Sequence, residues 1–240
     1  YLKREDMQVV RSFKIRGAYH KMKTLDTNSM TRGVICASAG NHAQGVAFAC
    51  SALNIRGTIY MPTTTPKQKI SKVKHFGGEW IEVRLVGDTF DDANKVALKH
   101  SADESLPYIH PFNDVDVMAG QGTVAKEILD EMLSPVDFIF VAVGGGGLIS
   151  GVGSYVRQKS PDTKIIAVEA EGAPALAESM KENKLIRLEK IDSFADGIAV
   201  QAIGDQTFEI IKNVVDDIVL VPEGKICSSI LSLYNDEAIV

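Results

Sequence analysis

The chain has 240 residues, of which 45% are hydrophobic, so it can bury the core of one large domain or of two small ones. Its net charge of -5, from 26 Lys and Arg against 31 Asp and Glu, is spread along the chain without the basic stripe that nucleic-acid binding requires. Its three cysteines lack the spacing of a zinc site or a disulfide framework. We therefore expect reduced thiols in a cytoplasmic protein that does not bind nucleic acid.

In the first half of the chain, short apolar runs alternate with amphipathic stretches. We predict strands at residues 34–37, 57–62 and 80–83, and helices at about 42–53, 68–76 and 89–100. A loop of small residues at 38–41 joins the first strand to the first helix. Strands that alternate with helices in this way form a parallel sheet.

The second half of the chain repeats this order, with strands predicted at 138–143, 164–168 and 218–221 and a helix at 148–158. Between the halves, residues 106–114 are expected to form a short strand that leads into a turn containing Pro and Asn. We place the domain crossover there. The prediction is a small domain at 32–111 inserted into a large domain made of 1–31 and 112–240, with a ligand in the cleft between them.

The stretch from Phe138 to Val156 carries no charge and is long enough to resemble a membrane span. Its glycines at 144 to 147, 151 and 153 are too many for one helix that faces lipid, so we predict a strand, a loop and a helix. The chain opens on a charged segment, Tyr1 to Asp6, without the apolar core of a signal peptide. We expect neither a membrane span nor a signal peptide.

Four consecutive glycines, 144 to 147, follow a predicted strand and open a predicted helix. Backbone N–H groups at a helix N-terminus bind anions, so this loop is a candidate phosphate site. A dinucleotide site is the competing interpretation, but its third glycine would fall on Ile149 or Ser150. The Lys-Ser/Thr pair of a P-loop is also missing, and the similar spacing at Gly120 follows no suitable strand and is interpreted as a helix start.

A single lysine, Lys14, lies in a mostly apolar segment just before a predicted helix. Taken alone, it is best interpreted as an ordinary exposed lysine. Together with a phosphate loop and the polar loop at 38–41, however, it completes what a phosphorylated aldehyde cofactor needs.

Four segments in this order resemble the threonine dehydratase branch of the fold-type II pyridoxal-phosphate enzymes, which are relatives of serine racemase and of the tryptophan synthase β chain. They are Ser-Phe-Lys-Ile-Arg-Gly-Ala at 12–18, Ser-Ala-Gly-Asn-His-Ala-Gln-Gly at 38–45, Gly-Gly-Gly-Gly-Leu at 144–148 and Asp-Gly-Ile-Ala at 196–199. The resemblance covers essentially the whole chain and implies an α/β fold with two parallel-sheet domains. Val10 and Arg11, before the lysine segment, favour the biosynthetic branch, which serves isoleucine biosynthesis.

The resemblance implies that Lys14 holds pyridoxal 5′-phosphate covalently and later removes the Cα proton of the substrate. Phe13 would pack against the cofactor ring, and Asn41 would bond to the oxygen of its 3-hydroxyl group. The phosphate, near the β-hydroxyl of the substrate, would help to protonate the leaving group. The phosphate would itself be held by the backbone of Gly144, Gly145, Gly146 and Gly147, with Leu148 closing that loop.

The resemblance also implies the substrate and the reaction. A small-molecule amino acid would be held by its carboxylate at the loop formed by Ser38, Ala39, Gly40, Asn41 and His42. L-Threonine, and L-serine more weakly, would be dehydrated and deaminated by this lyase to 2-oxobutanoate or pyruvate and ammonia. We expect a homo-oligomer, either a dimer or a tetramer.

Three departures from related families leave alternatives open. Ala39 stands where serine racemases have a serine, so racemisation or another β-elimination or β-replacement reaction is the rival interpretation. Ala175 stands where one carboxylate of a divalent-cation site would be expected, so we predict no metal. The family's later segments do not follow residue 240, so an inactive fragment with an incomplete large domain is a further alternative.

His20, His75, His100 and His110 lack ligand spacing and are expected at the surface or in turns.

Overall fold

The computed structural model describes residues 1–239 and divides the chain into two compact units, Tyr1–Val124 and Ala125–Val240. The helix α6 (Val115–Glu131) runs through the point of division. The prediction of a small domain at 32–111 inserted between 1–31 and 112–240 uses different boundaries and stays a prediction.

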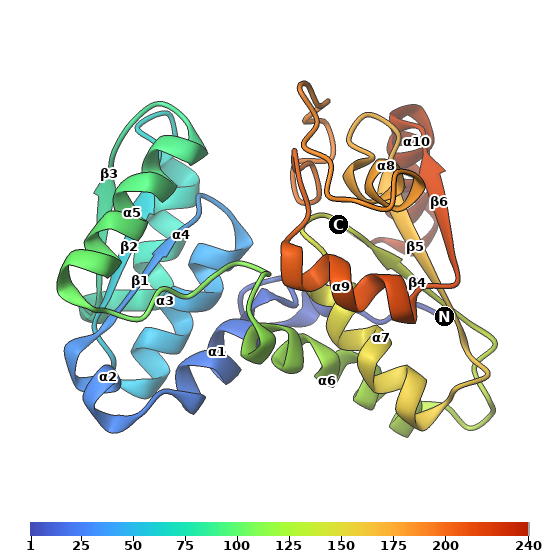
Figure 1. The fold of residues 1–240 in the computed structure, drawn as a ribbon, viewed down its shortest axis with the longest axis horizontal. Helices are drawn as coiled ribbons and strands as arrows, with labels where there is room; N and C mark the ends of the chain where they lie inside the picture. Colours follow the sequence, from blue (N-terminus) through green and yellow to red (C-terminus); the bar gives the residue numbers. More distant parts are fainter. Residues whose placement is uncertain (240) are drawn as a thin grey trace. The chain divides into compact units, whose positions relative to one another are not determined.

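The first unit contains a three-stranded parallel sheet in the order β1 (Val34–Ala37), β2 (Gly57–Met61) and β3 (Ile81–Leu85). Alternate side chains of these strands enter two separate apolar clusters, so both faces of the sheet are buried. One face is covered by α3 (Asn41–Leu53) and α4 (Lys67–Gly77), and the other by α5 (Phe90–Glu104), as Figure 1 shows. The remaining elements of this unit are η1 (Glu5–Met7), α1 (Lys14–Thr24), α2 (Thr27–Arg32) and η2 (Gly78–Trp80).

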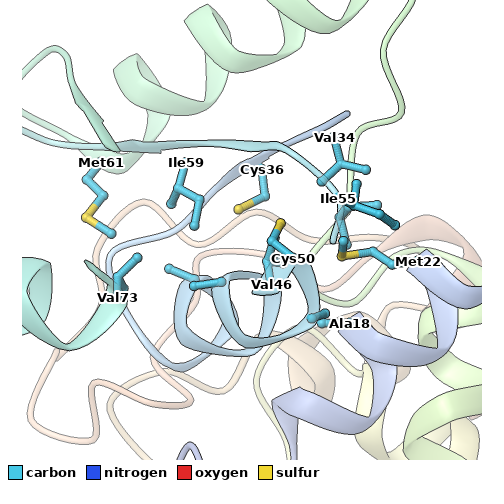
Figure 2. Packing of buried hydrophobic residues seen from close by; sticks show 14 residues of the cluster. Ala18, Met22, Val34, Cys36, Val46, Cys50, Ile55, Ile59, Met61 and Val73 are labelled. Atoms are coloured by element: carbon cyan, nitrogen blue, oxygen red, sulfur yellow. The ribbon is translucent and has the colours of Figure 1, made fainter. Parts of the chain in front are cut away.

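The larger apolar cluster of the first unit joins the sheet to α3. Figure 2 shows Cys36 and Ile59 of the strands near Val46 and Cys50 of α3, all four fully buried. Cys36, Cys50 and the exposed Cys227 are free thiols, and burial raises the pKa of Cys50 to about 12. The two buried thiols therefore pack as small apolar side chains.

The second unit contains a second three-stranded parallel sheet in the order β4 (Phe138–Ala142), β5 (Lys164–Ala170) and β6 (Asp217–Val221). Its helices are α7 (Gly147–Lys159), α8 (Ala175–Lys181), α9 (Asp205–Val214) and α10 (Glu223–Glu237). Helices α7 and α9 pack side by side (Figure 1), and a Cβ added at Gly153 would lie 2.4 Å from the side chain of Val214. The absence of a side chain at Gly153 allows α7 and α9 to approach this closely.

The α/β class and all six main strands predicted from the sequence are confirmed. The uncharged stretch from Phe138 to Val156 is a strand, a loop and a helix, as predicted, and none of the described helices has the length and apolarity to cross a membrane. The short strand predicted within 106–114 is wrong. Only Tyr108 forms a bridge, to Ile35, because prolines on either side supply no backbone N–H to extend the ladder.

Removing buried volume from the cluster on β2 should destabilise the first unit. Ile59 is fully buried there, and we expect Ile59→Ala to cost about 2–5 kcal/mol, the usual effect of a cavity. Chemical denaturation followed by circular dichroism measures this loss. The control is Leu98→Ala on α5, where the side chain is 45% exposed and the change should stay within about 0.5 kcal/mol. Equal effects of the two variants would contradict the assigned core.

Candidate functional site

Lys14 is the first residue of α1, and its amine has a backbone carbonyl as its partner. Lys14 Nζ donates a hydrogen bond of 2.7 Å to the carbonyl oxygen of Pro111 and lies 5.4 Å from the ring centroid of Phe13. Within the described part of the chain no carboxylate pairs with this amine. Burial lowers the pKa of Lys14 to about 8. A substantial fraction of the amine is therefore uncharged and nucleophilic at neutral to mildly alkaline pH.

The polar loop that follows β1 lies in the same unit as this lysine. The backbone N–H of Gly40 donates to Ser38 Oγ at 3.2 Å, and α3 begins at Asn41 without a side-chain cap. A Cβ added at Gly40 would meet nothing within 4 Å, so the backbone here faces open space. The uncapped N–H groups at the start of α3 can donate hydrogen bonds to an anion such as a carboxylate. A Cβ at Gly45 would lie 3.0 Å from the carbonyl oxygen of Lys14, which places the start of α3 directly against the start of α1.

His42, in the first turn of α3, is buried and makes a single hydrogen bond. Its Nε2 lies 2.8 Å from the carbonyl oxygen of Ile109, and its Nδ1 has no partner. Burial, followed by the charge of Lys14, lowers the pKa of His42 to about 3. The imidazole is therefore neutral throughout the physiological pH range.

The four glycines connect β4 to α7 in the second unit. Gly146 adopts a φ of 91°, and a Cβ there would lie 2.8 Å from Ile211 and 2.9 Å from Thr207. A Cβ at Gly144 would lie 3.1 Å from the backbone of Ile198, which belongs to the Asp-Gly-Ile-Ala segment. Gly146 therefore requires glycine, and a side chain at Gly144 would fit only if the backbone of Ile198 moved slightly. The loop leads to the N-terminus of a 13-residue helix, where N–H groups can bind a phosphate.

The glycine loop is braced by a neighbouring segment that the sequence did not identify. Thr207 Oγ1 is buried and lies 2.8 Å from the carbonyl oxygen of Gly145 and 3.0 Å from that of Gly204. The backbone N–H of Gly204 also donates to the carbonyl oxygen of Gly145, at 3.3 Å. These bonds fix one face of the loop and leave the N–H groups of the helix start for a ligand.

The predicted site residues thus form two groups. Phe13, Lys14 and the loop from Ser38 to His42 lie together in the first unit, whereas Gly144 to Leu148 lie in the second. Sequence reasoning missed the carbonyl oxygens of Pro111 and Ile109. Their signal in the sequence is the His-Pro-Phe-Asn turn at 110–113.

Glu169 is buried at the end of β5, but both of its oxygens are engaged. They accept the backbone N–H groups of Leu176 and Ala177, each at 2.8 Å. Burial raises the pKa of Glu169 to about 7. Among residues 1–239, no group of three His, Cys, Asp or Glu side chains is arranged to hold a metal ion.

Comparison with known proteins finds a matching family and several similar relatives. The family described as "Pyridoxal-phosphate dependent enzyme" matches residues 1–240. The biosynthetic L-threonine dehydratase IlvA of Bacillus subtilis is 59% identical over all of this chain, and that of Halalkalibacterium halodurans is 56% identical. The chain spans only 57% and 58% of the lengths of these two relatives.

Solved structures agree with the fold. The processed form of threonine deaminase isoform 2 from Solanum lycopersicum is similar with a TM-score of 0.96 and 45% identity, covering 100% of this chain and 69% of its own. Maize serine racemase is similar with a TM-score of 0.92 and 32% identity, covering 98% of this chain and 70% of its own. The resemblance found in the sequence is therefore confirmed.

Removing the brace on the glycine loop should weaken phosphate binding. Thr207→Val keeps the side-chain shape but loses the hydroxyl, and we expect affinity for pyridoxine 5′-phosphate to fall about three- to tenfold. This ligand carries the phosphate but cannot form an imine, so titration calorimetry reports the loop alone. The matched control is Ser228→Ala on α10, whose exposed hydroxyl bonds only within its own helix. An affinity equal to that of the control would show that the brace does not organise the loop.

Proposed function

Because the chain belongs to the pyridoxal-phosphate-dependent enzymes, we propose that it carries out the reaction of a threonine dehydratase. L-Threonine would lose water and then ammonia to give 2-oxobutanoate, and L-serine would give pyruvate more slowly. The observation that carries the proposal is the half-buried amine of Lys14, with its pKa lowered to about 8 and no carboxylate partner among the described residues. The biosynthetic relatives support a place at the first step of isoleucine biosynthesis.

The residues present fit pyridoxal phosphate. Lys14 offers a partly uncharged amine, and the glycine loop, packed against Ile198 and Thr207, leads to a helix N-terminus whose N–H groups would hold a phosphate. When bound, the cofactor supplies an electron sink for the pair of electrons released at Cα.

The chain's own groups then have distinct tasks in the proposal. The amine of Lys14 binds the cofactor aldehyde and takes the Cα proton as general base, which requires an uncharged nitrogen. Phe13 packs against the cofactor ring, and the amide of Asn41 bonds to its 3-oxygen. The backbone of the loop from Ser38 to His42 holds the substrate carboxylate. The N–H groups of residues 144–147 hold the phosphate, and Leu148 closes that loop.

Replacing Lys14 by arginine tests the proposal, because a guanidinium keeps the charge but can neither form an imine nor act as a base near neutral pH. We expect Lys14→Arg to lower the formation of 2-oxobutanoate by at least about 10²- to 10⁴-fold and to abolish the visible absorbance of the bound aldehyde. The control is Lys67→Arg, an exposed position on α4. Product formation by Lys14→Arg at the rate of the control would refute the proposed role.

Serine racemisation is the second candidate, since two solved serine racemases are similar to this chain. Racemisation needs a proton donor on each face of Cα, and the methyl group of Ala39 cannot supply one. We propose that elimination therefore predominates at this site.

Chiral chromatography of reactions with L-serine distinguishes the two activities. We expect D-serine to appear at least about 10²-fold more slowly than pyruvate, the usual cost of a missing acid. The variant Ala39→Ser should raise D-serine formation relative to pyruvate. Rapid D-serine formation by the unaltered protein would assign it to the racemases instead.

We also propose that the protein acts as a homo-oligomer, a dimer or a tetramer, in a reducing cytoplasm. The three free cysteines support the reducing compartment. Light scattering of the purified protein determines the number of subunits. Because the chain spans 57% of the length of its Bacillus relative, activity is to be measured on the full reading frame as well as on residues 1–240.

A further inference from the structure

The side chain of His42 has a fixed tautomer. Its Nε2 lies 2.8 Å from the carbonyl oxygen of Ile109, and because a carbonyl oxygen only accepts, Nε2 must carry the hydrogen. In the neutral ring Nδ1 then bears a lone pair, and this atom is buried without a partner. A buried acceptor without a partner destabilises a fold, so packing alone does not account for the position of this ring.

The segment that His42 holds is the same segment that holds Lys14. The carbonyl of Ile109 accepts from His42, and two residues later the carbonyl of Pro111 accepts from Lys14 Nζ at 2.7 Å. The N–H of Ile109 is also fixed, by a bond of 2.7 Å to the carbonyl oxygen of Ile35 on β1. Pro111 has a restricted φ, which removes one of the few backbone torsions between the two carbonyls, so a shift of the Ile109 carbonyl is passed on to that of Pro111.

The rest of the turn is closed by its own histidine. His110 Nδ1 accepts the backbone N–H of Phe112 at 3.2 Å and that of Asn113 at 2.7 Å. The turn from 109 to 113 is thus fixed from outside by β1, His42 and Lys14. Of the two side chains, Lys14 is the reacting residue of the proposed function and His42 is not.

The charge of His42 also suits this place. Because burial and the nearby lysine lower the pKa of His42 to about 3, the ring donates a hydrogen bond without adding a positive charge beside the amine. A charged donor at this position would repel the ammonium form of Lys14 and destabilise it.

We propose that His42 is a positioning residue for Lys14: by holding the carbonyl of Ile109, it keeps the carbonyl of Pro111 within hydrogen-bonding distance of the amine. The inference rests on the proposed function, since it takes Lys14 as the reacting residue. It gives the imidazole a task separate from that of the loop backbone, which is expected to hold the substrate carboxylate.

Two substitutions separate this role from packing. His42→Phe fills similar space without a donor, whereas His42→Gln carries an amide N–H that can replace Nε2–H. The control is His20→Phe, at an exposed position on α1. Thermal unfolding of each variant establishes that it is folded before the site is measured.

The first measurement is the pH profile of amine labelling by formaldehyde and borohydride in the cofactor-free protein. Mass spectrometry reads the modification of Lys14, and the modification of the exposed Lys67 is the internal reference. The unaltered protein should give a midpoint near the pKa of about 8. His42→Phe should lower the midpoint to about 7, because the bond to Pro111 stabilises the charged amine and is weakened when the turn loosens. His42→Gln should restore most of this change, and His20→Phe should match the unaltered protein.

Amide hydrogen exchange gives a second readout that does not depend on labelling. Exchange at Phe112 and Asn113 should speed up in His42→Phe and return toward normal in His42→Gln. A midpoint and exchange rates in His42→Phe equal to those of the unaltered protein would overturn the role of His42. Neither readout uses the cofactor, so a failure of pyridoxal phosphate to form an imine with the unaltered protein would count against the proposed function alone.

Discussion

The chemistry of the first unit depends on one interaction, the hydrogen bond from Lys14 to a carbonyl rather than to a carboxylate. A second lysine on the same helix, Lys21, shows the effect of carboxylate partners. Burial alone would lower the pKa of Lys21, but its bonds to Asp116 and Asp114 outweigh burial and raise it. Lys21 therefore stays an ammonium group and ties α1 to the start of α6. Lys14, two turns earlier, has a neutral partner and can lose its proton near neutral pH.

The two proposed anion sites have a common structural origin. Each lies where a buried parallel strand ends and a helix begins, after β1 at Gly40 and after β4 at Gly146. At such an edge the helix supplies free N–H groups, and the small residues before it let a ligand approach the backbone. The proposed function, with a substrate carboxylate and a cofactor phosphate, calls for two sites of this kind, and each unit contains one segment of the right form.

The sequence predicted these strand–loop–helix segments because their signals are local: an apolar run, a small-residue loop and a helix in order. It could not predict the contacts that hold them. The acceptor of Lys14 is a backbone carbonyl 97 residues away, and any residue type could present it. The tight contact at Gly144 likewise comes from the backbone of Ile198, which only the tertiary fold brings near. The role of the turn at 109–113 is not predictable for the same reason, since its partners lie on β1, α1 and α3.

The distribution of unmet hydrogen bonds supports a site at Lys14. Of the buried side-chain nitrogens and oxygens in residues 1–239, only Ser12 Oγ and His42 Nδ1 have no partner. One belongs to the residue two positions before Lys14, and the other to the ring whose pKa is lowered by burial and then by the charge of Lys14. A buried polar group without a partner destabilises a fold, so two such groups around one lysine are in keeping with the role proposed for Lys14.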